Sequence, residues 1–167
     1  MRLAVSCGMA ASPTERVQRL WTRLSPWPGG RWLFSRTLGW IVPYSGSIRP
    51  LVEELRPGFA RIGMTDRRGV RNHLNSIHAI ALVNLGEVTS GLAMISALPP
   101  GTRSIVTGLS TEFLKKARGT MTAECSCQVP DGIVDGVEQE VVSQITDRSG
   151  EVVARVRVTW RLGVQPS

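Results

Sequence analysis

The segment that most constrains the fold of this 167-residue chain is the apolar stretch from residue 76 to residue 98. It predicts a long helix that ends at the Pro99-Pro100-Gly101 sequence. Its large apolar residues are Ile77, Ile80, Leu82, Val83, Leu85, Val88, Leu92 and Ile95. They lie on nearly every face of the helix, and a helix without a polar face is buried on all sides. We therefore expect the rest of the domain to surround this helix.

Segments with strand patterns stand on both sides of the expected helix. Before it, residues 48–55 and 59–64 form a hairpin around a Pro-Gly turn. After it, apolar and polar residues alternate in four stretches, which are 104–114, 119–129, 136–146 and 151–162. Two strands, a buried helix and four strands predict an α+β domain over residues 46–167, with an antiparallel sheet around a long central helix.

Residues 1–45 are predicted to form a basic, tryptophan-rich helical extension. Ser12, Pro13 and Glu15 have the pattern of a capped helix start, and residues 31–40 form a second short helix. The first 50 residues hold seven arginines and one acid, and four of the five tryptophans lie between positions 21 and 40. We favour a helical cover packed on the domain. A membrane-surface contact through residues 14–40 and a substrate lid are the alternatives.

The composition excludes several classes of protein. Hydrophobic residues make up 42% of the chain and charged residues 20%, which is usual for a globular domain and argues against disorder. Cys7, Cys125 and Cys127 are too few for a zinc site or a disulfide framework. We expect no metal or other cofactor, a reducing cytoplasmic environment, and core positions for Cys125 and Cys127. The domain outside the extension is nearly neutral, so no nucleic-acid partner is expected.

Glu87 is the only ionised side chain between Ile77 and Leu98. Burying a carboxylate without a partner is costly unless its pKa rises or another group binds it. Carboxylates in such surroundings are candidate bases or nucleophiles. The structural alternative is a carboxylate that reaches solvent at the edge of the helix or of a subunit.

Polar residues crowd the start of the same helix. Ser76 or Asn75 can cap it, whereas Asn72 is too early for that role and is a candidate to hold a substrate carbonyl or a water. N–H groups near His78 can stabilise an oxyanion, although a histidine that only ends the helix is the alternative. Nine residues separate His78 from Glu87, which places them on opposite faces. A site that uses both must form between two subunits, which predicts an obligate dimer.

These residues resemble the PaaI-type hot-dog thioesterases. Their motif is an Asn, then His-Gly-Gly beginning six residues later, then an Asp nine residues after the His. Asn72, His78 and Glu87 have both spacings. The resemblance extends from about residue 46 to residue 162, strand order included, and is strongest to the thioesterase-like branch called DUF4442. It implies a hot-dog fold, in which a curved antiparallel sheet wraps one long helix.

The resemblance also implies a role for each motif residue. It makes Glu87 the base or nucleophile and has Asn72 position the water or the carbonyl. The Ala79 amide, directly after His78, forms the oxyanion contact, and the acid comes from the neighbouring subunit. Two positions depart from the motif, because Ala79-Ile80 replaces Gly-Gly and Glu87 replaces Asp.

Further substrate contacts follow from the same resemblance. A hydroxyl on the strand after the helix assists in some relatives, and Thr107 or Ser104 can supply it. Relatives bind the nucleotide part of coenzyme A near the position of Lys115, Lys116 and Arg118, so these cations are predicted to contact phosphate. The alternative for them is a solvated turn.

The predicted activity is hydrolysis of acyl-CoA or a related thioester, without a metal, by a homodimer or a dimer of dimers (a homotetramer). A protein that binds acyl-CoA or a fatty acyl group without turnover is the alternative, since the motif is substituted. A hot-dog dehydratase or hydratase is a weaker third hypothesis, because its usual Asp and His arrangement is not evident.

Overall fold

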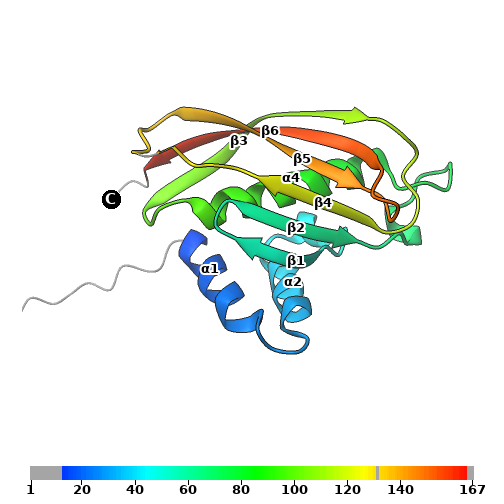
Figure 1. The fold of residues 1–167 in the computed structure, drawn as a ribbon, viewed down its shortest axis with the longest axis horizontal. Coiled ribbons are helices and arrows are strands. Elements are labelled where there is room, and N and C mark those ends of the chain that lie inside the picture. The colour runs from blue at the N-terminus through cyan, green and yellow to red at the C-terminus, as the bar shows by residue number, and fades with distance from the viewer. Residues whose placement is uncertain (1–12, 131, 165–167) are drawn as a thin grey trace, which may run out of the picture.

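The computed structural model describes residues 13–130 and 132–164, so the predicted cap Ser12 and Cys7 lie outside it. The helices are α1 (Pro13–Leu24), α2 (Gly30–Ile41), α3 (Pro43–Gly46) and α4 (Ala79–Ala97), with a 3-10 turn at Arg68–Val70. The strands are β1 (Leu51–Arg56), β2 (Phe59–Met64), β3 (Thr102–Phe113), β4 (Met121–Ser126), β5 (Val137–Thr146) and β6 (Val152–Val164). The described strands form one antiparallel sheet in the order β1-β2-β4-β5-β6-β3, which curves around α4 (Figure 1). The predicted order of two strands, one buried helix and four strands is confirmed.

Helix α4 is held tightly against the sheet in the middle of its length. Gly86 lies so close to β6 that a Cβ on it would be 2.4 Å from Cγ2 of Val156. The hydroxyl of Ser143, on β5, donates a hydrogen bond of 2.7 Å to the carbonyl of Gly86. Leu85, the preceding residue, has no exposed surface. These contacts fix the backbone of α4 immediately before Glu87.

The start of α4 differs from the predicted one. The helix begins at Ala79, three residues after the expected position, and His78 is its N-cap. Ile77 is still extended, because it pairs with Arg71 in an isolated bridge and donates its N–H to the carbonyl of Ala117 at 2.9 Å. Among the described residues, α4 is the single helix long and apolar enough to cross a membrane, and most of it is buried within the domain as a core helix.

Strand β3 forms one edge of the sheet, and among the described residues it pairs with β6 alone. A β-bulge between Val106 and Gly108 leaves Thr107 as the extra residue. A bulge of this kind changes which residues of a strand face the core. After it, Leu109, Thr111 and Phe113 face α4, opposite the buried residues Val158, Val156 and Ala154 of β6.

The N-terminal helices pack on the domain, as the helical-cover interpretation predicts. Gln18 of α1 donates from Nε2 to the carbonyls of Ile95 and Ser96 at the end of α4, at 3.2 and 2.9 Å. Ser35 of α2 accepts a hydrogen bond of 2.8 Å from the N–H of Val52 on β1. Figure 1 shows both helices beside the β1 edge of the sheet.

Both described cysteines face the core side of β4 or of the loop that follows it. Cys125 is buried and Cys127 is half-buried, which confirms that they contribute to packing. Burial raises the pKa of Cys127 to about 11, so its thiol stays protonated at neutral pH.

Candidate functional site

Glu87 lies on a strip of α4 that the sheet leaves open. Ile80, Val83 and Glu87 follow one another at spacings of three and four residues, which places them on one face. Ile80 is 52% exposed, whereas Val83 and Glu87 are half-buried. Within the described part of the chain, the Glu87 carboxylate has no hydrogen-bond or ion-pair partner, and burial raises its pKa above the ordinary 4.5. An unpaired carboxylate with a raised pKa has the properties of a general base.

The first turn of α4 leaves one backbone donor without an acceptor. The N–H of Ile80 donates to Nδ1 of His78 at 3.1 Å, and the N–H groups of Ala81 and Leu82 both donate to the carbonyl of His78. The N–H of Ala79 has no acceptor among the described residues, and Ala79 is exposed. His78 therefore caps the helix through its ring, and the Ala79 amide is the donor available to an oxyanion.

Asn72 organises the loop before α4, a role that the sequence analysis did not assign to it. Its Oδ1 accepts hydrogen bonds from the N–H of Leu74 at 2.9 Å and from both the N–H and the hydroxyl of Ser76 at 3.2 Å. The half-buried side chain keeps its Nδ2 group without a partner in the described residues. Nδ2 is therefore the group that can contact a substrate carbonyl, because it is the donor of the amide and Oδ1 only accepts hydrogen bonds.

A hollow of about 210 Å³ beside the first half of α4 contains a polar atom that sequence reasoning missed. The hollow is lined by Tyr44, Ser47, Ile48, Gly69, Val70, Arg71, His78, Ile80, Ala81 and Asn84. Asn84 donates from Nδ2 to the carbonyl of Tyr44 at 3.1 Å, but its Oδ1 is buried without a donor. The sequence already shows this amide among the mostly apolar residues of the helix. A buried acceptor of this kind can take an N–H or O–H of a ligand.

After the bulge, the hydroxyl of β3 that faces α4 is that of Thr111. The hydroxyl of Thr107 donates to the carbonyl of Thr159 at 3.4 Å, so it belongs to the bulge and to the sheet backbone. Thr111 lies opposite Val156, the residue that packs on Gly86, and its Oγ1 is buried without a partner. The bulge, which alternation in the sequence does not reveal, reverses the faces of the residues after it, so Thr111 faces α4 where unbroken alternation would place Ser110.

Ser104, the other predicted hydroxyl, lies near the start of β3, which follows the far end of α4. It is half-buried and lines a hollow of about 560 Å³ with Arg103, Ile105, Asp135, Gly136, Arg161, Leu162 and Gly163. None of these residues belongs to α4, so this hollow is separate from the open strip around Glu87, and the substrate contact of Ser104 stays a prediction.

The three predicted phosphate-binding cations fall into two groups. Lys115 donates to Asp147 at 2.8 Å and also to Glu151, and these carboxylates raise the pKa of its ammonium group. Lys115 is therefore already paired. Lys116 and Arg118 are exposed and have no acid partner among the described residues. They flank Ala117, whose carbonyl binds the N–H of Ile77, so their backbone lies beside the start of α4.

Glu87 and the Ala79 amide cannot bind the same carbonyl group within one chain. Their separation of eight positions corresponds to about 12 Å along the helix axis. The open strip of α4 and the edge strand β3 also leave apolar side chains in solvent, with Leu109 44% and Phe113 49% exposed on the face toward α4. Apolar residues on an unpaired edge strand are typical of a surface that another chain covers.

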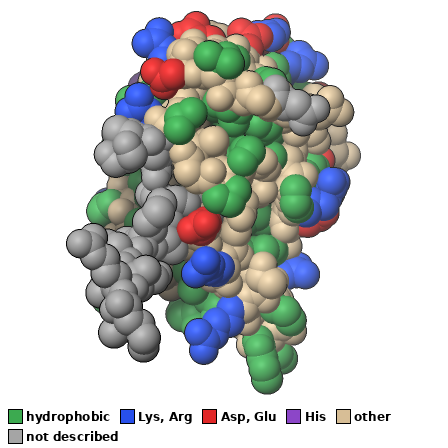
Figure 2. All heavy atoms as spheres, turned by 90° about the vertical axis from the view of Figure 1, so that its left-hand side faces the viewer, with side chains coloured by type: hydrophobic (Ala, Val, Ile, Leu, Met, Phe, Trp, Pro, Cys, Tyr) green, Lys and Arg blue, Asp and Glu red, His purple; other side chains and the backbone are tan. Residues whose placement is uncertain are grey.

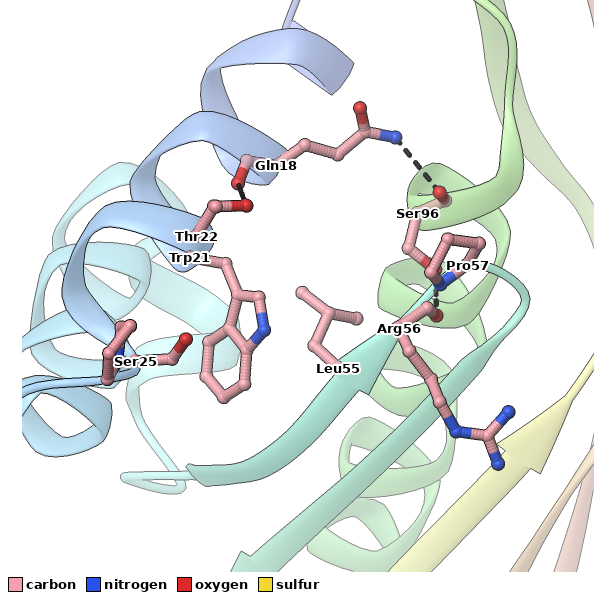
Figure 3. Close-up of a pocket in the computed structure, with 9 residues that line it drawn as sticks. Gln18, Trp21, Thr22, Ser25, Leu55, Arg56, Pro57 and Ser96 are labelled. Atoms are coloured by element: carbon pink, nitrogen blue, oxygen red, sulfur yellow. Dashed lines mark hydrogen bonds between the residues drawn. The ribbon is translucent and has the colours of Figure 1, made fainter.

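Two other features of the described residues lie outside this site. No group of three or more His, Cys, Asp or Glu side chains there is placed to hold a metal ion. A hollow of about 440 Å³ lies between α1 and the β1–β2 turn, where Trp21 and Leu55 face each other across it (Figure 3). It adjoins Ser96, about 13 Å along α4 from Glu87. It belongs to the contact between the extension and the domain.

One long helix wrapped by an antiparallel sheet in this strand order defines a hot-dog domain. The chain belongs to the family described as "Domain of unknown function (DUF4442)", which matches residues 30–162. The resemblance to hot-dog thioesterases and to this branch, seen first in the motif residues, is confirmed. The family match begins at residue 30, so it includes α2.

Solved structures share the fold over most of the chain. The structural-genomics protein APC5556 is 31% identical, with a TM-score of 0.76 over 89% of this chain and 97% of that one. PA5026 from Pseudomonas aeruginosa, described as a probable thioesterase, is 24% identical, with a TM-score of 0.67 over 95% and 100% of the two chains. A hypothetical thioesterase from Streptococcus pneumoniae, crystallised with coenzyme A, is 19% identical, with a TM-score of 0.64 over 77% and 99%. No curated protein matches this chain.

Proposed function

We propose that this protein hydrolyses acyl thioesters, with acyl-CoA as the substrate class. The observation that carries the proposal is Glu87, a half-buried carboxylate without a partner in the described residues, on the open strip of α4. The thioesterase names of structural neighbours support this chemistry. The neighbour crystallised with coenzyme A supports a CoA thioester as the substrate.

In the proposed reaction Glu87 takes a proton from a water molecule as the water oxygen attacks the thioester carbonyl carbon. The negative charge that develops on the carbonyl oxygen is stabilised by the free N–H of Ala79 and by Nδ2 of Asn72. When the carbon–sulfur bond breaks, the protonated Glu87 returns its proton to the leaving sulfur. The products are a carboxylic acid and a thiol, and no metal is needed. Direct attack by the carboxylate, through a transient anhydride, is the alternative for the first step.

The proposed site lies between two subunits. Glu87 of one subunit meets the first turn of α4 of the other, because the two groups are too far apart within one chain to bind one carbonyl. A partner on β3 and on the open strip of α4 would cover Leu109, Phe113 and Ile80, which a single chain leaves exposed. Two-fold symmetry would then give two equivalent sites per dimer.

Lys116 and Arg118 are proposed to bind phosphate groups of coenzyme A. Both are exposed beside the start of α4 and are unpaired among the described residues. Lys115 is left out of this role, because two carboxylates already hold its ammonium group. The nucleotide would thus bind at the edge of the site while the thioester reaches Glu87.

The direct test is thiol release from a panel of short, long and aromatic acyl-CoAs, together with equilibrium binding of the same compounds. The proposal predicts release above the spontaneous rate for at least one class. Binding without release would favour a protein that sequesters acyl-CoA, which the departures at Ala79-Ile80 permit. The absence of both release and binding would contradict both hypotheses.

The rate of hydrolysis is expected to fall at acidic pH, at a midpoint above the ordinary glutamate value. Burial raises the pKa of Glu87, and only the ionised carboxylate can accept a proton from water. Activity is therefore present above the raised pKa and is lost as the pH falls through it. The pH profile of kcat/KM measures this value in the free enzyme. An acid limb at or below pH 4.5 would show that the essential group is not a desolvated glutamate.

A further inference from the structure

The outward face of α2 carries large apolar side chains that nothing in the described structure covers. Trp32, Arg36 and Trp40 stand four residues apart and therefore share one face of the helix. Trp32 is 60% exposed and Trp40 is 90% exposed, and Leu33 beside them is 47% exposed. The opposite face, with Phe34 and Leu38, is buried against the domain. Helix α2 is thus apolar on two sides, and only one of them packs against the described part of the domain.

The exposed apolar surface continues beyond both ends of α2. Trp27, in the turn before the helix, is 71% exposed. Ile41, Val42 and Tyr44 follow the helix and are 65%, 43% and 67% exposed. Large apolar patches on a protein surface mark contacts with other molecules. Trp and Tyr in particular are enriched where a protein meets the interfacial region of a bilayer.

The charge of the same helices is of one sign. Residues 16–52 contain six arginines and no acid, and Glu15 is the acid at the start of α1. Arg16, Arg19 and Arg23 are exposed and lie along one face of α1, away from the face that holds Gln18 against α4. On α2, the guanidinium of Arg36 lies 5.8 Å from the ring centre of Trp32. Figure 2 shows blue and green side chains mixed at its lower end, where α1 and α2 lie.

We propose that the outer faces of α1 and α2 bind the surface of a membrane that contains anionic lipids. Arginines attract the negative headgroups, and the exposed tryptophans and Leu33 insert at the level of the headgroups and upper acyl chains. Charge complementarity selects this partner, since a neutral or basic protein surface would not explain the accumulation of arginine. The inner faces remain the cover of the domain, so the protein binds the membrane as a folded unit.

The experiment is sedimentation of the full-length protein with vesicles of phosphatidylcholine alone or of phosphatidylcholine mixed with phosphatidylglycerol. Binding is expected only to the anionic vesicles and should weaken as salt is added. Replacing Arg16, Arg19 and Arg23 together with glutamine should weaken binding on the order of 100-fold. The Trp32→Ser/Trp40→Ser variant should weaken it at least about 10-fold. Both variants should keep the thermal unfolding temperature, because the altered side chains are exposed.

The matched control is the triple variant Arg148→Gln/Arg157→Gln/Arg161→Gln. It removes the same charge from exposed positions outside α1 and α2, so it should still bind anionic vesicles. Equal binding to neutral and anionic vesicles, or unchanged binding by the tryptophan variant, would overturn the proposal. So would dissociation of an oligomer by the tryptophan variant, which would make this face a contact between copies of the chain.

Discussion

Replacing Glu87 with glutamine is expected to lower the rate of thioester hydrolysis by about 100-fold to 10,000-fold, the usual contribution of a general base. Glutamine keeps the size of the side chain but cannot accept a proton from water. The affinity for acyl-CoA should change little, because the proposed nucleotide contacts are made by Lys116 and Arg118. Thiol release and equilibrium binding, measured on the same preparation, separate the two effects. The matched control is Glu112→Gln on β3, an exposed carboxylate 3.3 Å from Arg155.

The same variant gives a second readout in thermal unfolding. Burial raises the pKa of Glu87, so folding favours its protonated form, and its contribution to stability is lost as the pH rises through the raised value. Glutamine carries no charge, so it avoids the cost of burying an ionised carboxylate. The unfolding temperature of Glu87→Gln at neutral pH should therefore be higher than that of the wild type. A lower unfolding temperature would indicate that the carboxylate has a structural partner and is not kept for catalysis.

Replacing Gly86 with alanine is expected to destabilise the protein by about 1–3 kcal/mol, the usual effect of overpacking a core. In a chain of this size that corresponds to a fall of several degrees in the unfolding temperature. A loss of stability is unusual for this substitution, because alanine normally stabilises a helix relative to glycine by about 1 kcal/mol. The added Cβ would stand 2.4 Å from Cγ2 and 2.5 Å from Cβ of Val156, so α4 or β6 must move.

Gly91→Ala is the matched control on the same helix. Its Cβ would meet the Trp160 ring at 3.3 Å, a tight contact that a small shift of the ring relieves. We expect Gly91→Ala to be clearly the milder of the two changes in chemical denaturation. If Gly86→Ala were neutral or stabilising, α4 would be less firmly seated on β6 than the packing indicates.

The architecture could be predicted because its two strongest signals are local. An apolar helix without a polar face, ended by Pro99-Pro100-Gly101, must be buried, and alternation predicts strands around it. The exact start of α4 could not be predicted in the same way. It depends on the bridge between Ile77 and Arg71 and on the bond to Ala117, which comes from a distant loop.

The candidate site was predicted less completely, because several of its features depend on tertiary contacts. The isolation of Glu87 on α4 was visible as one charge in an apolar run. The position of the Thr111 hydroxyl on the face toward α4 follows from a bulge at Thr107 that leaves no clear sign in the residue pattern. The pairing of Lys115 joins two turns that are far apart in the chain. Asn84 is visible in the sequence as an amide within the mostly apolar run of α4.

The central claim is that hydrolysis uses Glu87 of one subunit and the first turn of α4 of the other. It can be tested with Glu87→Gln and Ala79→Pro, which removes the proposed oxyanion donor. Proline is well tolerated at the first position of a helix, and His78 already has the extended backbone, with φ −64° and ψ 138°, that a residue before proline requires. Ala79→Ser keeps the N–H and should stay active.

The most direct measurement is thiol release after the two inactive variants are mixed, unfolded together and refolded. If each site combines two subunits, half of the dimers are mixed and each holds one intact site, so about a quarter of the wild-type rate should return. Separately refolded variants should remain inactive. If mixing restores no activity although mixed dimers form, the site does not combine Glu87 and the Ala79 amide from different subunits, and the proposed mechanism is wrong.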